Sequence, residues 1–209
     1  MVAGERLVAQ DGKEVCLFPC EAMYITPYRD PAEHDVYALD LLPYDANGNY
    51  ISAMPVYAPF SGSIVYTGND HNCILESDDR VHTPDGNLKF VRVLVAHDDN
   101  EPAQVGTHYT QGDLFYHSGN YGHSSGEHVH MEFAEVGSKS LQKWNNGGIG
   151  LFGGVHMWNA TYVDNTAMLR ALNFNWRKYG ASPYGSRRKR KFPWVLYAEK
   201  LRKRYYTQF

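Results

Sequence analysis

The sequence predicts a mainly β fold, in which an antiparallel sheet forms a groove. Up to residue 136, runs of β-branched and aromatic residues recur at strand-like lengths, at 54–58, 63–67, 88–97, 113–117 and 128–136. Clusters of Gly, Asn, Asp and Pro that favour turns separate these runs, at 45–49, 67–70 and 83–87. Short strands joined by turns build an antiparallel sheet, and a groove on such a sheet suits an extended peptide.

Length and composition indicate a globular protein with one sizeable core and an appendage. The chain has 209 residues, of which 43% are hydrophobic, which is typical of a packed domain. We expect no membrane span, because no run of about 18 apolar residues occurs. We also expect no signal peptide, because the first residues lack an apolar run. Three cysteines without a Cys-x-x-Cys pair argue against a disulfide scaffold.

We expect three parts: a lead-in at 1–23, a domain at 24–176 and, set apart by its charge, a basic tail at 177–209. Residues 1–176 hold 9 Lys and Arg against 22 Asp and Glu, a net charge of −13. The tail holds 11 against 1, a net charge of +10. The stretch 137–176, rich in Gly, Asn and aromatic residues, is assigned to the domain.

The tail is expected to form a linker followed by a short basic helix. In its last part, apolar side chains recur at helical spacing, at Val195, Ala198, Leu201 and Tyr205. A basic amphipathic helix could bind an acidic partner protein, its own acidic domain or an anionic surface. A solvated tail is the alternative. Nucleic acid ranks lower, because no nucleic-acid reading motif accompanies the charge.

A histidine pair, His128 and His130, follows a glycine-rich loop, residues 119–127. Side chains alternate faces along a strand, so both rings would point to one side, about 6.5 Å apart. That spacing allows both rings to serve one metal ion, whereas a solvated strand face is the alternative. Structural zinc has about four protein ligands, and catalytic zinc about three plus water. The chain must therefore supply further ligands.

Two other regions offer candidates. Asp40 stands between two leucines, and a carboxylate in such a setting is seldom buried without a partner. A metal is one such partner; a capping or salt-bridge role is the alternative. His97 ends an apolar run where a polar turn begins, a position that ordinary loop-edge histidines also occupy.

Together these residues resemble a known family. His34 and Asp40 come first, then His97, then His128 and His130. Further matching segments lie at 55–65, 105–106, 111–113, 118–119, 122 and 125–127. Over about residues 24–136 the set resembles the lysostaphin-type, LytM-like zinc metalloendopeptidases, which cut peptide bonds in bacterial peptidoglycan. The resemblance implies their duplicated-hybrid-motif-like β groove and Zn²⁺ as cofactor.

The resemblance also implies residue roles. His34, Asp40 and His130 would bind zinc, while His97 and His128 would face the metal-bound water and the scissile carbonyl. Asp40 follows His34 by six residues, whereas the family spacing is four. A straight strand would separate the two by about 20 Å, so the segment must bend, or Asp35 or Asp45 replaces Asp40.

Three further features are assigned around this site. Glu132, two residues after His130, is a candidate partner for the second ring nitrogen of that ligand, although an exposed glutamate is the alternative. His123 could line the cleft or be a polar loop residue. The stretch 79–90 exceeds the family's usual hairpin and is expected to border the cleft.

These features predict a hydrolase of peptidoglycan stem or cross-bridge peptides. The basic tail and the missing signal peptide resemble a lytic protein of a phage tail, carried in the virion, that opens the cell wall during DNA entry and contacts other tail proteins. An endolysin for host lysis is one alternative. A non-catalytic zinc-binding structural or adhesion module is the other. The bond that is cut does not follow from the sequence.

Overall fold

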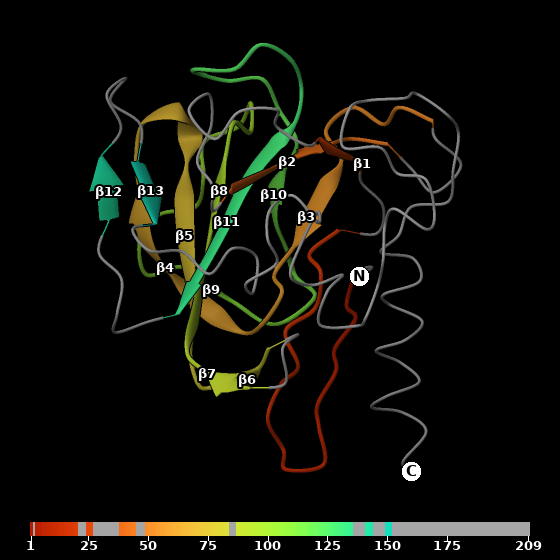
Figure 1. The fold of residues 1–209 in the computed structure, drawn as a ribbon, viewed down its shortest axis with the longest axis vertical. Coiled ribbons are helices and arrows are strands. Elements are labelled where there is room, and N and C mark those ends of the chain that lie inside the picture. Colours follow the sequence, from red (N-terminus) through yellow and green to blue (C-terminus); the bar gives the residue numbers. More distant parts are fainter. Residues whose placement is uncertain are drawn as a thin grey trace.

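The fold is taken from a computed structural model, which describes residues 1, 3–20, 24–26, 38–44, 49–83, 87–135, 141–143 and 149–151. Its architecture is mainly β, and every pair of neighbouring strands is antiparallel (Figure 1). The predicted fold class is thereby confirmed. The basic tail at 177–209 lies outside the described residues. Within the described part, no helix is long and apolar enough to cross a membrane.

A seven-stranded sheet forms the centre of the molecule. Its strands lie in the spatial order β1 (Tyr24–Thr26), β2 (Ala38–Leu42), β11 (Val129–Glu135), β8 (Val91–Ala96), β5 (Cys73–Ser77), β4 (Gly62–Thr67) and β9 (His108–Tyr109). Three two-stranded sheets accompany it, made of β3 (Pro55–Tyr57) with β10 (Leu114–His117), β6 (Val81–His82) with β7 (Leu88–Lys89), and β12 (Leu141–Lys143) with β13 (Ile149–Leu151). A 3-10 turn, η1 (Asn69–His71), precedes β5.

Each of the five sequence-predicted runs contains strand, but β5 was missed. Its first three residues, Cys73, Ile74 and Leu75, are all buried. A strand covered on both faces gives a short apolar run instead of an alternating pattern, so periodicity does not reveal it. Its neighbours β4 and β8 cover its two edges. The strand therefore becomes recognisable only once the sheet is assembled.

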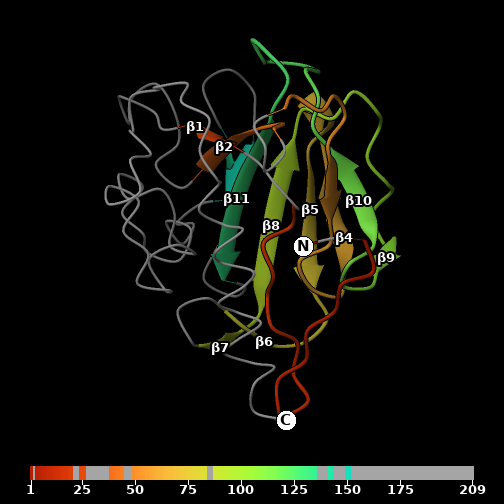
Figure 2. The same cartoon turned by 90° about the vertical axis from the view of Figure 1, so that its right-hand side faces the viewer.

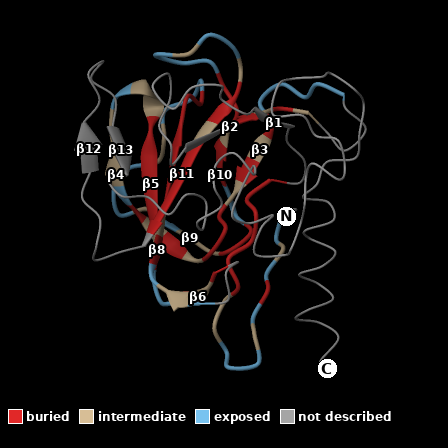
Figure 3. Ribbon diagram, viewed as in Figure 1, coloured by how far each residue is buried: buried red, intermediate tan, exposed pale blue. Residues whose placement is uncertain are grey.

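The two faces of the central sheet have different roles. One face supplies the main core, including Leu41, Val93, Val95, Met131 and Phe133, all essentially buried (Figure 3). The opposite face carries a smaller apolar cluster of Ile74, Leu94 and Ala134. Because residues two apart share a face, His130 and Glu132 lie on the same side of β11 as Ala134. Polar groups thus stand on the face away from the main core.

The N-terminal segment, residues 3–20, packs onto this framework (Figure 2). Its buried side chains include Leu7, Val15 and Phe18. The buried Gln111 side chain ties it down: Nε2 donates to the carbonyls of Val15 and Pro59 at 2.7 and 2.9 Å, and Oε1 accepts from the Leu7 N–H at 2.8 Å. The matching segment 111–113 therefore includes a residue that holds the fold together.

Candidate metal centre

Strand register brings Asp40 and His130 together. β2 pairs with β11 so that these two residues are direct cross-strand partners, which places their side chains on one face. The Nδ1 atom of His130 lies 3.3 Å from Oδ1 of Asp40. Asp40 is 6% exposed. His34, Asp35 and Asp45 lie outside the described residues, so the expected bend between His34 and Asp40 stays a prediction.

His97 reaches the same place from the end of β8. The last residue of β8, Ala96, pairs with His130, and the next residue has a φ of +83°. For a residue other than glycine, this left-handed conformation costs about 1–2 kcal/mol. Two backbone hydrogen bonds hold it: His97 N–H donates to the Asp70 carbonyl at 3.0 Å, and Tyr121 N–H donates to the His97 carbonyl at 3.1 Å. The strained backbone turns the ring toward the histidine pair.

Four side chains therefore converge at one end of the sheet. The ring centroid of His97 lies 4.7 Å from that of His128 and 6.0 Å from that of His130. The Nε2 atom of His128 lies 3.4 Å from Oδ2 of Asp40. The structure thus brings together four of the five main residues that the sequence singled out, from three different strands and their ends.

The glycine-rich loop sets the tautomers of His97 and His128. Nδ1 of His97 lies 2.9 Å from the Tyr121 carbonyl, and Nδ1 of His128 lies 2.7 Å from the Gly126 carbonyl. A carbonyl oxygen can only accept, so each Nδ1 carries the hydrogen. When such a ring is neutral, Nε2 keeps its lone pair. On His128, this atom faces Asp40.

The loop can approach so closely because it contains glycines. A Cβ atom at position 119 would stand 2.2 Å from the His97 carbonyl oxygen. At Gly122, the φ is +77°, and a Cβ would meet the Asp70 carboxylate at 2.0 Å. A side chain at either position would push the loop off the histidines.

Burial and neighbouring charges shift the pKa values of His97 and His130 in opposite directions. Burial, together with the neighbouring His128, lowers the pKa of His97 to about 4, so its ring is neutral at pH 7. Burial also opposes charge on His130, but the carboxylates of Asp40 and Glu132 outweigh it and raise the pKa of that ring to about 10.

Glu132 is fully buried rather than exposed. Its Oε1 atom lies 2.9 Å from Nε2 of His130. This contact takes one ring nitrogen of His130 and turns the other, Nδ1, toward Asp40. Carboxylates commonly orient metal-binding histidines in this way.

The donor set fits a zinc ion in its chemistry. A carboxylate and an imidazole nitrogen face each other, and a buried carboxylate supports the imidazole from behind, as in known zinc sites. The two carboxylates beside His130 are negative charges that a cation at this place would balance. Across the described ranges, no three His, Cys, Asp or Glu side chains form a complete metal-binding group. Asp40 and His130 would supply two of the three expected ligands, and His34 would be the third.

Two further expectations concern the surroundings of the site. His123 is exposed, and its backbone N–H donates to Asp70 at 3.1 Å, so its place in the cleft or in a polar loop stays a prediction. The prediction that residues 79–90 border the cleft is wrong: β6 and β7 lie at the opposite end of the molecule from the glycine-rich loop (Figure 1). There, the Cys16 N–H bonds the His82 carbonyl at 2.8 Å. This stretch therefore supports the N-terminal segment.

Sequence reasoning missed Asp70, Tyr121 and Glu127, which hold the loop and the histidines. Asp70 and Tyr121 act partly through their backbone, which no residue type reveals. For Glu127 the sequence did offer an indication, because an acid directly before His128 is well placed to accept hydrogen bonds beside the site.

Comparison with known proteins gives distant similarities. No family model matches the chain. It is 28% identical over 126 residues to "Morphogenesis protein 1" of Bacillus phage B103, a match that covers 59% of this chain and 34% of that protein. The chain thus spans about a third of the length of this relative.

Several solved structures with similar folds are peptidases. A zinc-containing peptidase from Vibrio cholerae has a TM-score of 0.41 at 14% identity, with 62% of this chain and 43% of that chain covered. The catalytic domain of lysostaphin from Staphylococcus simulans has a TM-score of 0.37 at 20% identity, with 61% and 84% covered. The prophage-encoded M23 protein EnpA of Enterococcus faecalis has a TM-score of 0.40 at 14% identity, with 57% and 88% covered.

Proposed function

We propose that the protein is a zinc-dependent endopeptidase that hydrolyses peptide bonds of bacterial peptidoglycan. The observation that carries this proposal is the convergence of Asp40, His97, His128 and His130 at one end of the sheet. A carboxylate and three imidazoles in one place, two of them with fixed tautomers, suit metal-assisted hydrolysis of an amide.

In this proposal, Asp40, His130 and His34 hold the ion, and Glu132 fixes the ring of His130. Bound zinc would polarise the scissile carbonyl and lower the pKa of a water molecule to about 7. His97 is neutral at pH 7 and accepts a proton at Nε2. His128 presents its Nε2 beside Asp40, where it can accept a proton or, once protonated, donate to a developing oxyanion.

The substrate proposal draws on the resemblance to LytM-like enzymes and on the site's position at the end of an antiparallel sheet. The stem or cross-bridge peptides of peptidoglycan present an extended backbone with small side chains, which such a sheet can accommodate.

The direct test incubates the purified protein with peptidoglycans of several cross-link types and identifies newly freed amino groups by mass spectrometry. Metal-stripped protein and a His128→Ala variant run alongside. We expect zinc-dependent release of one defined amine and a loss of about 10²- to 10⁴-fold in the variant. Equal release by the metal-stripped protein would contradict the zinc proposal; no release from any wall would contradict the enzyme and favour a structural module.

We further propose that the enzyme belongs to a phage particle and acts on the wall during DNA entry. The similarity to a phage protein named "Morphogenesis protein 1" supports this proposal, as does the basic tail, which suits an acidic partner in a tail assembly. Mass spectrometry of purified particles of the encoding phage tests it. Presence in the particle at fixed stoichiometry is expected, whereas presence only in the soluble lysate would point to an endolysin.

A further inference from the structure

We infer that Glu127 is a positioning residue that fixes the ring orientation of His128 by tying the glycine-rich loop to the chain segment before β3. Glu127 touches neither Asp40 nor a histidine ring in the contacts that define the site. Its influence passes through the backbone.

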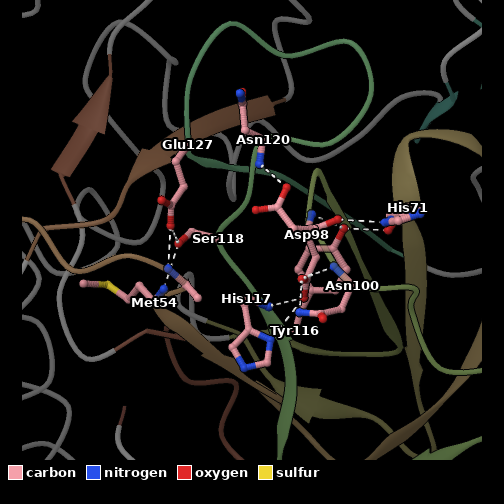
Figure 4. Close-up of polar contacts among 11 residues, drawn as sticks. Met54, His71, Asp98, Asn100, Tyr116, His117, Ser118, Asn120 and Glu127 are labelled. Atoms are coloured by element: carbon pink, nitrogen blue, oxygen red, sulfur yellow. Dashed lines mark hydrogen bonds and ion pairs between the residues drawn. The ribbon is translucent and has the colours of Figure 1, made fainter.

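The carboxylate of Glu127 accepts four hydrogen bonds from two separate segments. Figure 4 shows the contact with Ser118. From the segment before β3, Ala53 N–H donates at 2.6 Å, Ser52 Oγ donates at 3.0 Å and the Tyr50 hydroxyl donates as well. From the end of β10, Ser118 Oγ donates at 2.7 Å. We call these residues the Glu127 network.

Ser118 extends the network into the core of the molecule. The same hydroxyl that donates to Glu127 accepts from the Met54 N–H at 2.8 Å, and the Ser118 N–H donates to the Met54 carbonyl at 2.9 Å. Ser118 and Met54 are both buried. The carboxylate is therefore anchored to a rigid part of the fold rather than to another surface loop.

The structure also explains why this anchor acts on His128. The carbonyl that accepts from His128 Nδ1 is that of Gly126, which belongs to the peptide group joining Gly126 to Glu127. When the Glu127 side chain is held, that peptide group is held too. The hydrogen then stays on Nδ1, and Nε2 stays turned toward Asp40.

The charge of the carboxylate suits this task. Although burial opposes the ionised form, the hydrogen bonds from Tyr50 and Ser118 outweigh it and lower the pKa of Glu127. An ionised carboxylate only accepts, and all four partners are donors, so the network has one arrangement. A glutamine in its place would bring an N–H₂ group against donors and break one side of the network.

The experiment compares Glu127→Ala and Glu127→Gln with a matched control, Glu14→Ala. Glu14 also binds one backbone N–H and one hydroxyl, those of Ser61, at 2.7 and 2.6 Å. It belongs to the N-terminal segment, at the end of the molecule away from the loop (Figure 1). The control therefore loses similar hydrogen bonds without touching the Gly126 peptide.

Two readouts are used on zinc-loaded protein. Nitrogen-15 NMR of the histidine side chains reports the tautomer of His128, with its signals assigned by their loss in His128→Ala. Steady-state kinetics of peptidoglycan cleavage report kcat and KM separately. For Glu127→Ala, we expect a mixture of His128 tautomers and a kcat lowered by about 10- to 100-fold at an unchanged zinc affinity, as a misplaced catalytic group would give. Glu127→Gln should fall between this variant and the wild type, and Glu14→Ala should change neither readout.

An unchanged tautomer in both Glu127 variants would overturn the inference, even if thermal stability fell. If Glu127→Ala does not fold, Tyr50→Phe and Ser52→Ala each remove one donor and should give smaller shifts in the same direction. The kinetic readout rests on the proposed function, but the tautomer does not. A wild-type protein that cleaves no wall while its Glu127 variants lose the tautomer would refute the function and retain the inference.

Discussion

Asp40 and Asp98 are both buried carboxylates close to the histidines of the site, 6% and 4% exposed, yet their surroundings differ. Asp98 accepts hydrogen bonds from the N–H and the side-chain amide of Asn100 at 2.8 and 3.0 Å and from the N–H of His117 at 2.7 Å. Asp40 instead faces the imidazoles of His128 and His130 at 3.4 and 3.3 Å. Asp98 is thus surrounded by two backbone N–H groups, one side-chain amide and one imidazole, Nδ1 of His117 at 3.2 Å, whereas Asp40 faces two imidazoles.

This difference suggests different roles for the two carboxylates, one in stabilising the fold and one in binding a ligand. The Asp98 group is completed by Tyr116, whose hydroxyl accepts from the Asp98 N–H at 3.0 Å and donates to the His71 carbonyl at 2.6 Å (Figure 4). Such a closed network stabilises a fold. In contrast, the carboxylates of Asp40 and Glu132 lie beside the imidazole rings of His128 and His130. That arrangement favours a bound cation.

The largest effect is expected on catalysis, from Asp40→Ala. Loss of a zinc ligand should remove zinc from the site and bring wall cleavage to background. The metal-free variant should also be less stable than the metal-free wild type, because Asp40 is one of the two carboxylates that favour the charged form of the buried His130 ring. The loss should be smaller than in Asp98→Ala, since Glu132 still pairs with that ring. Metal analysis and denaturant unfolding of both apo proteins check this. Zinc retained by the Asp40→Ala variant would contradict its role as a ligand.

Asp98→Ala should give the largest effect on stability. Removing this carboxylate takes the acceptor from the N–H of the half-buried His117 and from two donors of the exposed Asn100, so the free energy of unfolding should fall by about 1–3 kcal/mol. Below the unfolding transition, the variant should still bind zinc. Chemical denaturation together with metal content measures both quantities. A stability change below about 1 kcal/mol would contradict the structural role.

Glu132→Gln tests the support behind His130. The amide still reaches Nε2 of His130 but carries no charge, so zinc affinity should weaken by about 10- to 100-fold. Competition with a chromophoric zinc chelator measures the change. Asp98→Asn is the matched control, since it also replaces a buried carboxylate by an amide near the site, and it should leave zinc affinity within about 3-fold.

The smallest effect should come from Asp78→Ala. Its carboxylate lies 2.7 Å from Nε2 of His108, and both side chains are about half exposed. An exposed pair of this kind contributes about 0–1 kcal/mol. Thermal unfolding and cleavage assays should therefore barely differ from the wild type. A larger loss of stability would show that even an exposed histidine–carboxylate pair stabilises this protein.

The fold class and part of the site were predictable because they depend on local patterns. Alternating β-prone runs and turn clusters predicted β3, β4, β8, β10 and β11, and the His-x-His spacing placed His128 and His130 on one strand. β5 was not predicted, because its first three residues are all buried and the strand therefore lacks an alternation of apolar and polar residues. The length and polar character of residues 79–90 wrongly predicted a place beside the cleft, since this stretch contacts the N-terminal segment at the far end of the molecule.

By itself, the sequence determined which chemistry the chain can offer: two histidines two residues apart, an acid between leucines, a histidine at a strand end and glycines before the pair. Tertiary structure alone decided how these groups meet. Strand register set Asp40 opposite His130, and a left-handed backbone at His97 turned its ring inward. Backbone carbonyls of the loop chose the tautomers. Such contacts join residues far apart in the chain through main-chain atoms that every residue shares, so no residue type could reveal them.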